Sequence, residues 1–443
     1  MKLIKALYFS NRFFIAAGVL AAIFLFGYFI PILVPMAKAA FLLWIGIAFS
    51  DIIILFSSRK GVEGTRLTPQ RLSNGDNNEI LITVQNFLRI PVTISVLDEI
   101  PPQFQARNLS FRVSLASGEM KRLRYALRPV KRGEYEFGAV NIFVQSVLRL
   151  VSRRIRIAQK NIVPVYPSFI QMRKYELVAI SNRLVETGIK RIRRIGHNME
   201  FEQIKKYVAG DDVRTINWKA TARKAELMVN NFQDERSQQV YSLIDKGRVM
   251  QMPFQGMSLL DYAINASLVI SNIAIRKSDR AGLITFQDKI GTILPASRLN
   301  KQMSTILEVL YNQKTAYRES DFSVLYSTVR RRITQRSLLL LFTNFETLYG
   351  LQRQLPFIKN LARRHQLVVI FFENTEMKSL IDQRAETLQS VYYKSVAEKF
   401  SFEKKMIVKE LHKNGIQALV TTPEKLTINT INKYLELKAR NLI

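Results

Sequence analysis

The residues that could carry out chemistry are few and scattered. The chain has no cysteine, and its three histidines, His197, His365 and His412, lie far apart in the sequence. A thiolate nucleophile, a disulfide framework and a thiolate metal site are therefore excluded, and a zinc cluster lacks its ligands. The sequence also lacks three common catalytic motifs. These are the Gly-x-x-x-x-Gly-Lys-Ser/Thr loop of ATP hydrolysis, the Gly-x-Ser-x-Gly turn of serine hydrolases and the His-Glu-x-x-His pattern of zinc proteases. We therefore predict a protein that is not an enzyme and holds no cofactor.

Asp211 and Asp212 are adjacent carboxylates, and paired carboxylates can act as general acid and base. Neighbouring side chains on a turn diverge, so capping of the helix that follows is the better interpretation. In this interpretation one of the two aspartates forms an ion pair with Arg214 or Arg223. Trp218 is then a large apolar anchor that holds the connector against its neighbouring domain. A recognition face for a partner protein or a phosphate is the alternative.

The charge of the chain predicts a polyanionic neighbour. It holds 66 Lys and Arg against 35 Asp and Glu, a formal net charge of +31. Nucleic acid, a nucleotide and an anionic membrane leaflet all fit such a charge. Residues 183–224 alone hold eleven basic and five acidic side chains. Basic runs are usually solvated surface, so we expect no nucleic-acid binding and keep anionic lipid headgroups as an alternative ligand.

The amino end is apolar enough to enter a membrane. Residues 13–34 carry no charge over 22 positions, and a helix of that length spans about 33 Å, against about 30 Å for a bilayer core. A second apolar run, residues 39–56, is interrupted only by Asp51. Residues 1–58 therefore predict a hairpin of two transmembrane helices. The first run is too long for a secretory signal peptide, the competing interpretation.

Basic residues flank this hairpin, whereas its expected turn carries only Lys38. The positive-inside rule then places both ends of the hairpin, and the soluble domains, in the cytoplasm. Asp51 is costly in lipid, so it should face the other helix or lie near the interface. A functional carboxylate within the membrane is the alternative. The flanking residues are Lys2, Lys5, Arg12, Arg59 and Lys60.

Two periodicities divide the remaining chain. Apolar residues alternate from Asn78 to about Tyr166, which is typical of strands with one buried face and predicts an antiparallel, sandwich-like β domain over residues 59–170. From Gln238 onward, short apolar runs alternate with amphipathic helices. This predicts an α/β domain over residues 237–443, with helices on both faces of a mostly parallel sheet. Residues 171–236 form a connector.

The connector carries eleven residues at fixed spacing: Gly196, Phe201, Tyr207, Gly210, Asp211, Asp212, Arg214, Ile216, Trp218, Ala222 and Arg223. This pattern resembles the bacterial family catalogued as domain of unknown function 58. Lys205 stands where the family usually has arginine. Residues 132–138 and 165–167 also match the family, so the resemblance covers nearly the whole chain.

This resemblance implies several properties. The α/β domain should be similar to a von Willebrand factor type A domain. The protein should be a multi-pass protein of the bacterial inner (cytoplasmic) membrane. Family members are commonly encoded beside AAA+ ATPases of the MoxR type, which implies an adaptor or other protein-binding role with such a partner. The alternative is an anion- or phospholipid-binding module on the inner membrane surface.

The resemblance also indicates where a metal would bind. Type A domains that bind metal use Asp-x-Ser-x-Ser after their first strand, which supplies oxygen ligands to a hard divalent cation. Here Asp245 is retained, but Gly247 and Val249 replace both serines, and Asn344 stands where an aspartate is usual. Lys246 and Arg248 crowd the carboxylate. We therefore expect a degenerate site that binds no metal.

Overall fold

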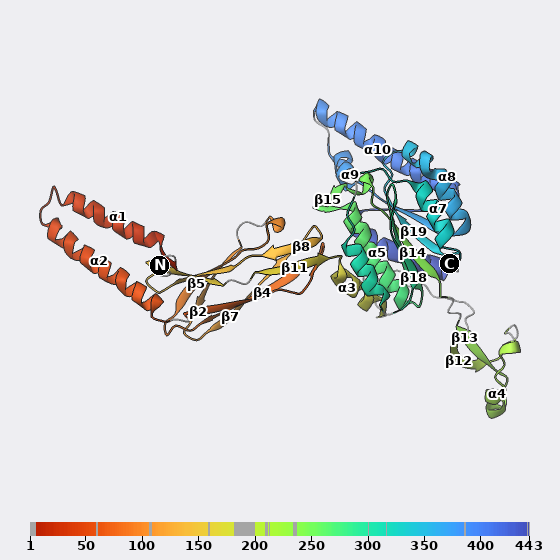
Figure 1. Cartoon of the computed structure of the whole chain (residues 1–443), viewed down its shortest axis with the longest axis horizontal. Coiled ribbons are helices and arrows are strands. Elements are labelled where there is room, and N and C mark those ends of the chain that lie inside the picture. The colour runs from red at the N-terminus through yellow and green to blue at the C-terminus, as the bar shows by residue number, and fades with distance from the viewer. Residues whose placement is uncertain are drawn as a thin grey trace. The chain divides into compact units, whose positions relative to one another are not determined.

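The computed structural model divides into two compact units, residues 1–166 and residues 167–443, drawn in Figure 1. The boundary lies close to the one predicted at residue 170, but the amino-terminal helices and the β domain form one unit. The residues that the structure describes are 6–58, 61–105, 109–157, 160–180, 200–208, 211, 213–233, 237–299, 301–315, 317–384, 387–440 and 442.

Two apolar helices, α1 (Asn11–Phe26) and α2 (Leu33–Phe56), begin the first unit. They contact through aromatic rings, with Phe13 and Trp44 centroids 4.5 Å apart. The predicted end of the first helix and the predicted start of the second were wrong by several residues, whereas the second helix ends at Phe56 as predicted. The first helix stops near Gly27 and Pro31, which are poor helix residues, whereas Pro35 is tolerated because it lies in the first turn of α2. Lys38 therefore lies inside α2 instead of in the turn.

The two helices differ in how far they can reach. Among the described helices, α2 alone, with 24 residues, is long and apolar enough to cross a membrane by length and composition. The helix α1 has 16 residues, about 24 Å at 1.5 Å per residue. The structure thus gives one candidate membrane helix near the amino end where the sequence predicted two.

Asp51 is fully buried in α2, and it binds the β domain instead of facing the other helix. One carboxylate oxygen accepts from the Ser146 hydroxyl, and the other accepts from the backbone N–H groups of Leu150 and Val151 at 3.2 and 3.1 Å. The Arg153 guanidinium donates to the Leu55 carbonyl at 2.7 Å, at the carboxyl end of the same helix. A polar clamp therefore joins α2 to the sheet.

The β domain consists of three small sheets around one apolar core. The predicted alternation is confirmed in β4, where Ile80, Ile82 and Val84 are fully buried. Every pairing is antiparallel except β3 with β11. The sheet orders are β1-β10-β9-β5-β6, β2-β4-β7 and β3-β11-β8. The strands are β1 (Leu7–Phe9), β2 (Val62–Leu67), β3 (Leu72–Ser73), β4 (Asn78–Asn86), β5 (Val92–Asp98), β6 (Ser110–Leu115), β7 (Met120–Leu127), β8 (Gly133–Phe137), β9 (Val140–Gln145), β10 (Val151–Ile157) and β11 (Asn161–Tyr166).

The second unit contains a six-stranded sheet in the order β18-β17-β14-β19-β20-β21. Its strands are parallel except β18, an edge strand that pairs antiparallel with β17 and that periodicity did not predict. The strands are β14 (Gln239–Asp245), β17 (Arg280–Phe286), β18 (Ile290–Ser297), β19 (Leu338–Phe342), β20 (Gln366–Phe372) and β21 (Gln417–Thr421). The helices are α3 (Phe169–Ile180), α5 (Leu259–Arg276), α6 (Gln302–Tyr311), α7 (Phe322–Arg332), α8 (Leu348–Arg364), α9 (Thr375–Asp382), α10 (Leu388–Lys413) and α11 (Leu426–Ala439).

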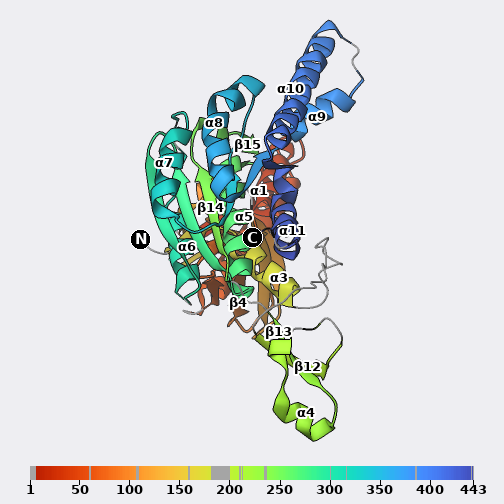
Figure 2. The same cartoon turned by 90° about the vertical axis from the view of Figure 1, so that its right-hand side faces the viewer.

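Helices cover both faces of this sheet, as predicted (Figure 2). Side chains alternate along β14: Val240 and Ile244 pack with α5, α6 and α11, whereas Tyr241 and Leu243 pack with α7, α8 and α10. Each face thus has its own apolar core. The sheet is buried on both sides, which explains why its central strands are continuous apolar runs.

Candidate functional site

The strands β14 and β19 lie side by side, yet the helices that follow them, α5 and α8, cover opposite faces of the sheet. In doubly wound α/β sheets such a switch point leaves a crevice outside the carboxyl ends of the strands, where ligands commonly bind. Asp245 ends β14 and Thr343 directly follows β19, so both lie at this crevice. A cavity of about 240 Å³ opens there, and its lining includes Asp245, Arg248, Asn344 and Arg353.

Hydroxyl and amide donors surround the fully buried carboxylate of Asp245. The Thr343 hydroxyl donates to Oδ2 at 2.7 Å, and the Gly247 N–H donates to Oδ1 at 2.8 Å. The Ser320 hydroxyl also donates to Oδ1. Burial raises the pKa of Asp245 above its ordinary value, while these three hydrogen bonds oppose the rise. Both carboxylate oxygens are therefore engaged by the chain itself.

Ser320 is a site residue that sequence reasoning missed. It lies 75 positions from Asp245, just before α7, and no local motif marks it. A Cβ at Gly247 would overlap the Ser320 hydroxyl, so Ser320 occupies the space that a serine at position 247 would need. Gly247 therefore does not leave a gap in the ring of oxygens around Asp245. The hydroxyl that a serine at position 247 would supply comes instead from Ser320, in another segment of the chain.

The other residues of the predicted degenerate site have separate roles. Val249 packs against the core on the α5 side of the sheet. Lys246 is half-buried, and burial lowers the pKa of its ammonium. Within the described residues, no ion pair links the Asp245 carboxylate to Lys246 or Arg248, the two cations that lie close to it in the sequence. The described residues also hold no cluster of three or more metal-ligating side chains.

Lys404 of α10 brings a positive charge to the same edge of the sheet. Its ammonium donates to Asn344 Oδ1 at 2.6 Å and lies 5.3 Å from the centre of the Phe371 ring. Burial lowers the pKa of Lys404 to about 8, and the nearby carboxylate of Glu346 partly opposes this shift. Asn344, expected at a metal position, therefore binds an ammonium group of the chain.

The connector motif forms a hairpin of β12 (Glu200–Lys206) and β13 (Met228–Gln233), with helix α4 (Trp218–Lys224) between the strands. Asp211 accepts from Lys205 at 2.8 Å and from the Val208 N–H at 3.0 Å, so it closes the turn after β12. Asp211 therefore does not act as the predicted helix cap, and the alternative, Asp212, lies outside the described residues. Asn217 caps α4, because its side chain accepts from the Ala220 N–H at 3.0 Å.

Trp218 is 70% exposed, so the expectation of a buried aromatic anchor is also wrong. Ala222 and Arg223 are exposed on the same short helix. Tyr207 donates its backbone N–H to the Leu227 carbonyl at 2.8 Å, next to the hairpin strands. The backbone places Phe201 in β12 and Arg214 in the turn of residues 213–215. Gly196, Gly210 and Asp212 lie outside the described residues.

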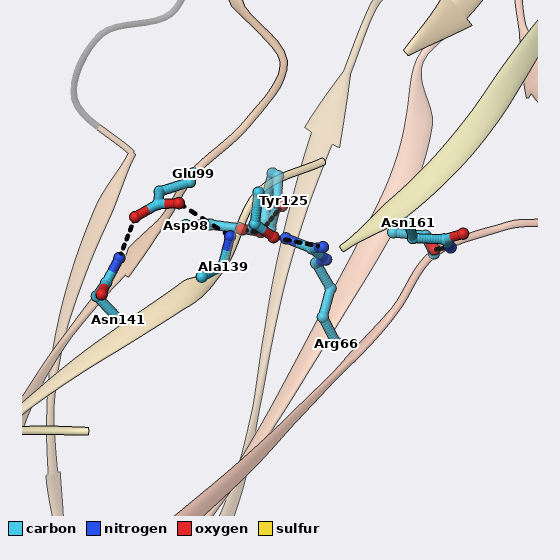
Figure 3. Close-up of polar contacts among 9 residues, drawn as sticks. Arg66, Asp98, Glu99, Tyr125, Ala139, Asn141 and Asn161 are labelled. Carbon is cyan, nitrogen blue, oxygen red and sulfur yellow. Dashed lines mark hydrogen bonds and ion pairs between the residues drawn. The ribbon is translucent and has the colours of Figure 1, made fainter. Parts of the chain in front are cut away.

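The β domain contains another buried carboxylate, Asp98, with a different set of partners (Figure 3). Arg66 Nη1 lies 2.5 Å from Asp98 Oδ1, and the Tyr125 hydroxyl donates to Oδ2. The same guanidinium donates to the Gly138 carbonyl at 3.0 Å. Burial and the neighbouring carboxylate raise the pKa of Tyr125 far above its usual value. Next to this cluster, Glu99 accepts from the Ala139 N–H and the Asn141 amide, which lowers the pKa of Glu99.

Fold and site together define a doubly wound α/β domain with a polar crevice at its switch point. Residues 203–389 match the family model described as protein of unknown function DUF58, which confirms the resemblance over that range. The uncharacterized protein YeaD of Bacillus subtilis (strain 168) is 25% identical over 211 residues, which are 45% of this chain and 51% of that protein. The match thus spans about half the length of that relative.

Two solved structures show local likeness. The conserved hypothetical protein BatB from Bacteroides thetaiotaomicron shares 14% identity over 46% of this chain and 98% of that chain, with a TM-score of 0.33. The CARDB domain of the PF1109 protein from Pyrococcus furiosus shares 18% identity over 24% of this chain and 86% of that chain, with a TM-score of 0.17. At these TM-scores neither likeness bears on function.

Proposed function

We propose that this protein is a membrane-anchored, cytoplasm-facing interaction protein of the bacterial inner membrane. In this proposal α1 and α2 form the anchor, and the α/β domain is of the von Willebrand factor type A kind. The sheet order supports that kind of domain, because in chain order it is the doubly wound arrangement 3-2-1-4-5-6. The length and hydropathy of α2 support the anchor.

The crevice at the switch point is the observation that carries the proposal. Its carboxylate is held by the chain's own hydroxyls, and its rim exposes side chains that suit protein contact. Tyr349 is 79% exposed on this rim, and Arg353 forms a surface ion pair with Glu319. Tyrosine and arginine are common among the residues that dominate protein interfaces. We therefore place the partner at the carboxyl edge of the sheet.

The partner in this proposal is an AAA+ ATPase of the MoxR type, for which the family resemblance is the support. A test would express the full chain with an affinity tag, solubilise the membranes and measure how much of the ATPase co-purifies. Tyr349→Ala combined with Arg353→Glu should remove most of it. Arg336→Glu is the matched control, because Arg336 is exposed before β19, at the opposite edge of the sheet.

Equal recovery of the ATPase with both variants would contradict the proposed docking edge. Absence of any such ATPase, together with salt-sensitive binding of the soluble domains to anionic liposomes, would favour the second candidate function. In that candidate the basic surface binds phospholipid headgroups. The charge of +31 is the observation that favours it.

A further inference from the structure

The loop between β9 and β10, residues 146–150, is bound to both amino-terminal helices. Its Ser146 hydroxyl and Leu150 N–H donate to Asp51 of α2. Ser10, which directly precedes α1, donates its backbone N–H to the Leu150 carbonyl at 3.0 Å and its hydroxyl to the Arg149 carbonyl at 2.5 Å. These hydrogen bonds therefore fix the position of the loop along the axes of the two helices.

The tip of this loop is apolar and exposed. Val147 is 69% exposed and Leu148 is 42% exposed. The next residue, Arg149, has a φ of +55°, a left-handed conformation that residues other than glycine rarely adopt. Hydrogen bonds on either side of the tip hold this shape, so the two apolar side chains are presented by a well-defined loop.

Exposed apolar surface on α2 reaches the same level. Phe49 is 63% exposed and Ile53 is 53% exposed, and these residues lie on either side of Asp51 along the helix. Both are two residues from Asp51, so at about 100° per residue they lie on the face of α2 that points away from the loop. Because Asp51 binds the loop directly, the tip lies at the same level along the helix axis as Phe49 and Ile53. A bilayer that surrounds this level of α2 would therefore also lie at the level of Val147 and Leu148.

Basic side chains surround this end of the β domain. Arg12 is exposed at the start of α1, and Arg89 is exposed in the loop between β4 and β5. That loop lies at the same end, because Asn86 at the end of β4 pairs with Val62, which closely follows α2. Arg149 lies in the tip loop itself. Their acidic neighbours include Glu63 and Glu119, and Glu119 is paired with Lys121 at 3.2 Å.

We propose that the Val147–Leu148 tip enters the leaflet of an anionic lipid bilayer, with Arg12, Arg89 and Arg149 at the level of the phosphates. An apolar tip below a ring of cations matches the layered chemistry of a leaflet, in which acyl chains lie beneath negative headgroups. This inference rests on the proposed insertion of α2 in the membrane. The inference adds that the β domain itself has a lipid-binding surface and that no linker separates this domain from the membrane.

The absence of cysteine from the sequence makes the test direct. Single variants Val147→Cys, Leu42→Cys and Asn77→Cys of the full chain would each carry an environment-sensitive fluorophore, with Leu148→Cys as a second tip position. The chains are reconstituted in vesicles of phosphatidylcholine with phosphatidylglycerol that contain lipids spin-labelled at a shallow or a deep position. Leu42 is exposed on α2, about 13 Å from Asp51. Asn77 is exposed at the opposite end of β4.

We expect a blue-shifted emission at positions 147 and 148, with stronger quenching by the shallow label than by the deep one. Position 42 should be quenched more by the deep label, and position 77 by neither. Addition of phosphatidylglycerol should increase the quenching at positions 147 and 148. The double variant Arg12→Gln, Arg89→Gln should reduce this increase. Quenching at 42 without quenching at 147 and 148 would overturn this inference alone. Absence of quenching at 42 would overturn the membrane anchor, and this inference with it.

Discussion

Two buried aspartates, Asp98 in the β domain and Asp245 in the α/β domain, are held in opposite ways. Asp98 binds the guanidinium of Arg66, so its negative charge is matched by a cation inside the core. Asp245 binds two hydroxyls and one N–H, so its charge has no ionic partner among the described residues, and a cavity opens beside it. Burial alone therefore does not distinguish a structural carboxylate from one at a crevice. The two are distinguished by the kind of donor that each carboxylate binds and by the presence of a cavity beside it.

Removing the cation from the first site should have the largest effect. Arg66→Met leaves Asp98 as an uncompensated buried charge, which costs about 3–5 kcal/mol of stability. Hydrogen exchange of β5 and β7 peptides, in the full chain in detergent, would measure the loss. Arg124→Met on the exposed face of β7 is the matched control. A loss no larger than that of the control would show that the ion pair does not stabilise the β domain.

Removing one hydroxyl from the second site should cost less. Thr343→Val keeps the side-chain shape but leaves Asp245 Oδ2 without its donor, a loss of about 1–3 kcal/mol. The raised pKa of Asp245 means that the folded state holds the proton more tightly than the unfolded chain. Stability therefore falls as pH rises above the ordinary value of 3.8. The variant raises this pKa further, so the fall should continue to higher pH.

Hydrogen exchange of the β19 peptides as a function of pH would follow this effect. Exposed Thr334→Val, just before β19, is the control and should behave like the parent chain. If Thr343→Val costs as much as Arg66→Met, the contrast between the two carboxylates is wrong, because a hydroxyl donor would then matter as much as a cation.

Replacing Lys404 should reveal a pH dependence of the opposite sign. Its folded pKa of about 8 is below the ordinary 10.5, so the folded state binds fewer protons and stability rises between these two values. Lys404→Met should abolish that rise and stabilise the domain below pH 8 by about 2 kcal/mol. This is the roughly 3 kcal/mol that corresponds to the pKa shift, less about 1 kcal/mol for the lost hydrogen bond to Asn344. Lys405→Met, exposed on the same helix, is the control. An unchanged pH profile in Lys404→Met would contradict the assigned pKa.

Divalent metals should give no measurable effect at Asp245. The ammonium of Lys404 occupies Asn344, and Ser320 and Thr343 direct their protons at the carboxylate. Titration calorimetry of the full chain with magnesium, manganese and calcium is the measurement. A stoichiometric site tighter than millimolar that disappears in Asp245→Ala would show that this crevice does bind metal.

Trp218→Ala gives the baseline for an aromatic residue outside both buried sites. At 70% exposure its truncation should change stability by no more than about 0.5 kcal/mol. Hydrogen exchange of the β12 and β13 peptides would measure it. A large loss would mean that this side chain is covered in the working protein, and parallel loss of a co-purifying partner would identify what covers it.

Local periodicity predicted most of the elements, because each pattern depends only on neighbouring residues. The alternation of Ile80, Ile82 and Val84 marked a strand with one buried face. The apolar runs of the α/β sheet marked strands buried on both faces, and hydropathy marked residues 39–56 of α2 but not its first six residues. The edge strand β18 was missed because its half-buried face gives no continuous apolar run.

The sequence by itself therefore determined the two kinds of sheet, the apolar amino end and the excess of positive charge. Only the tertiary structure decided which distant groups meet. Ser320 reaches Asp245 across 75 positions, and Ser146 reaches Asp51 across 95. Such contacts depend on strand order and on the pairing of far-apart segments, and no spacing within one segment encodes these. For the same reason Asp51 looked like a lone charge in an apolar helix until the β9–β10 loop was placed against it.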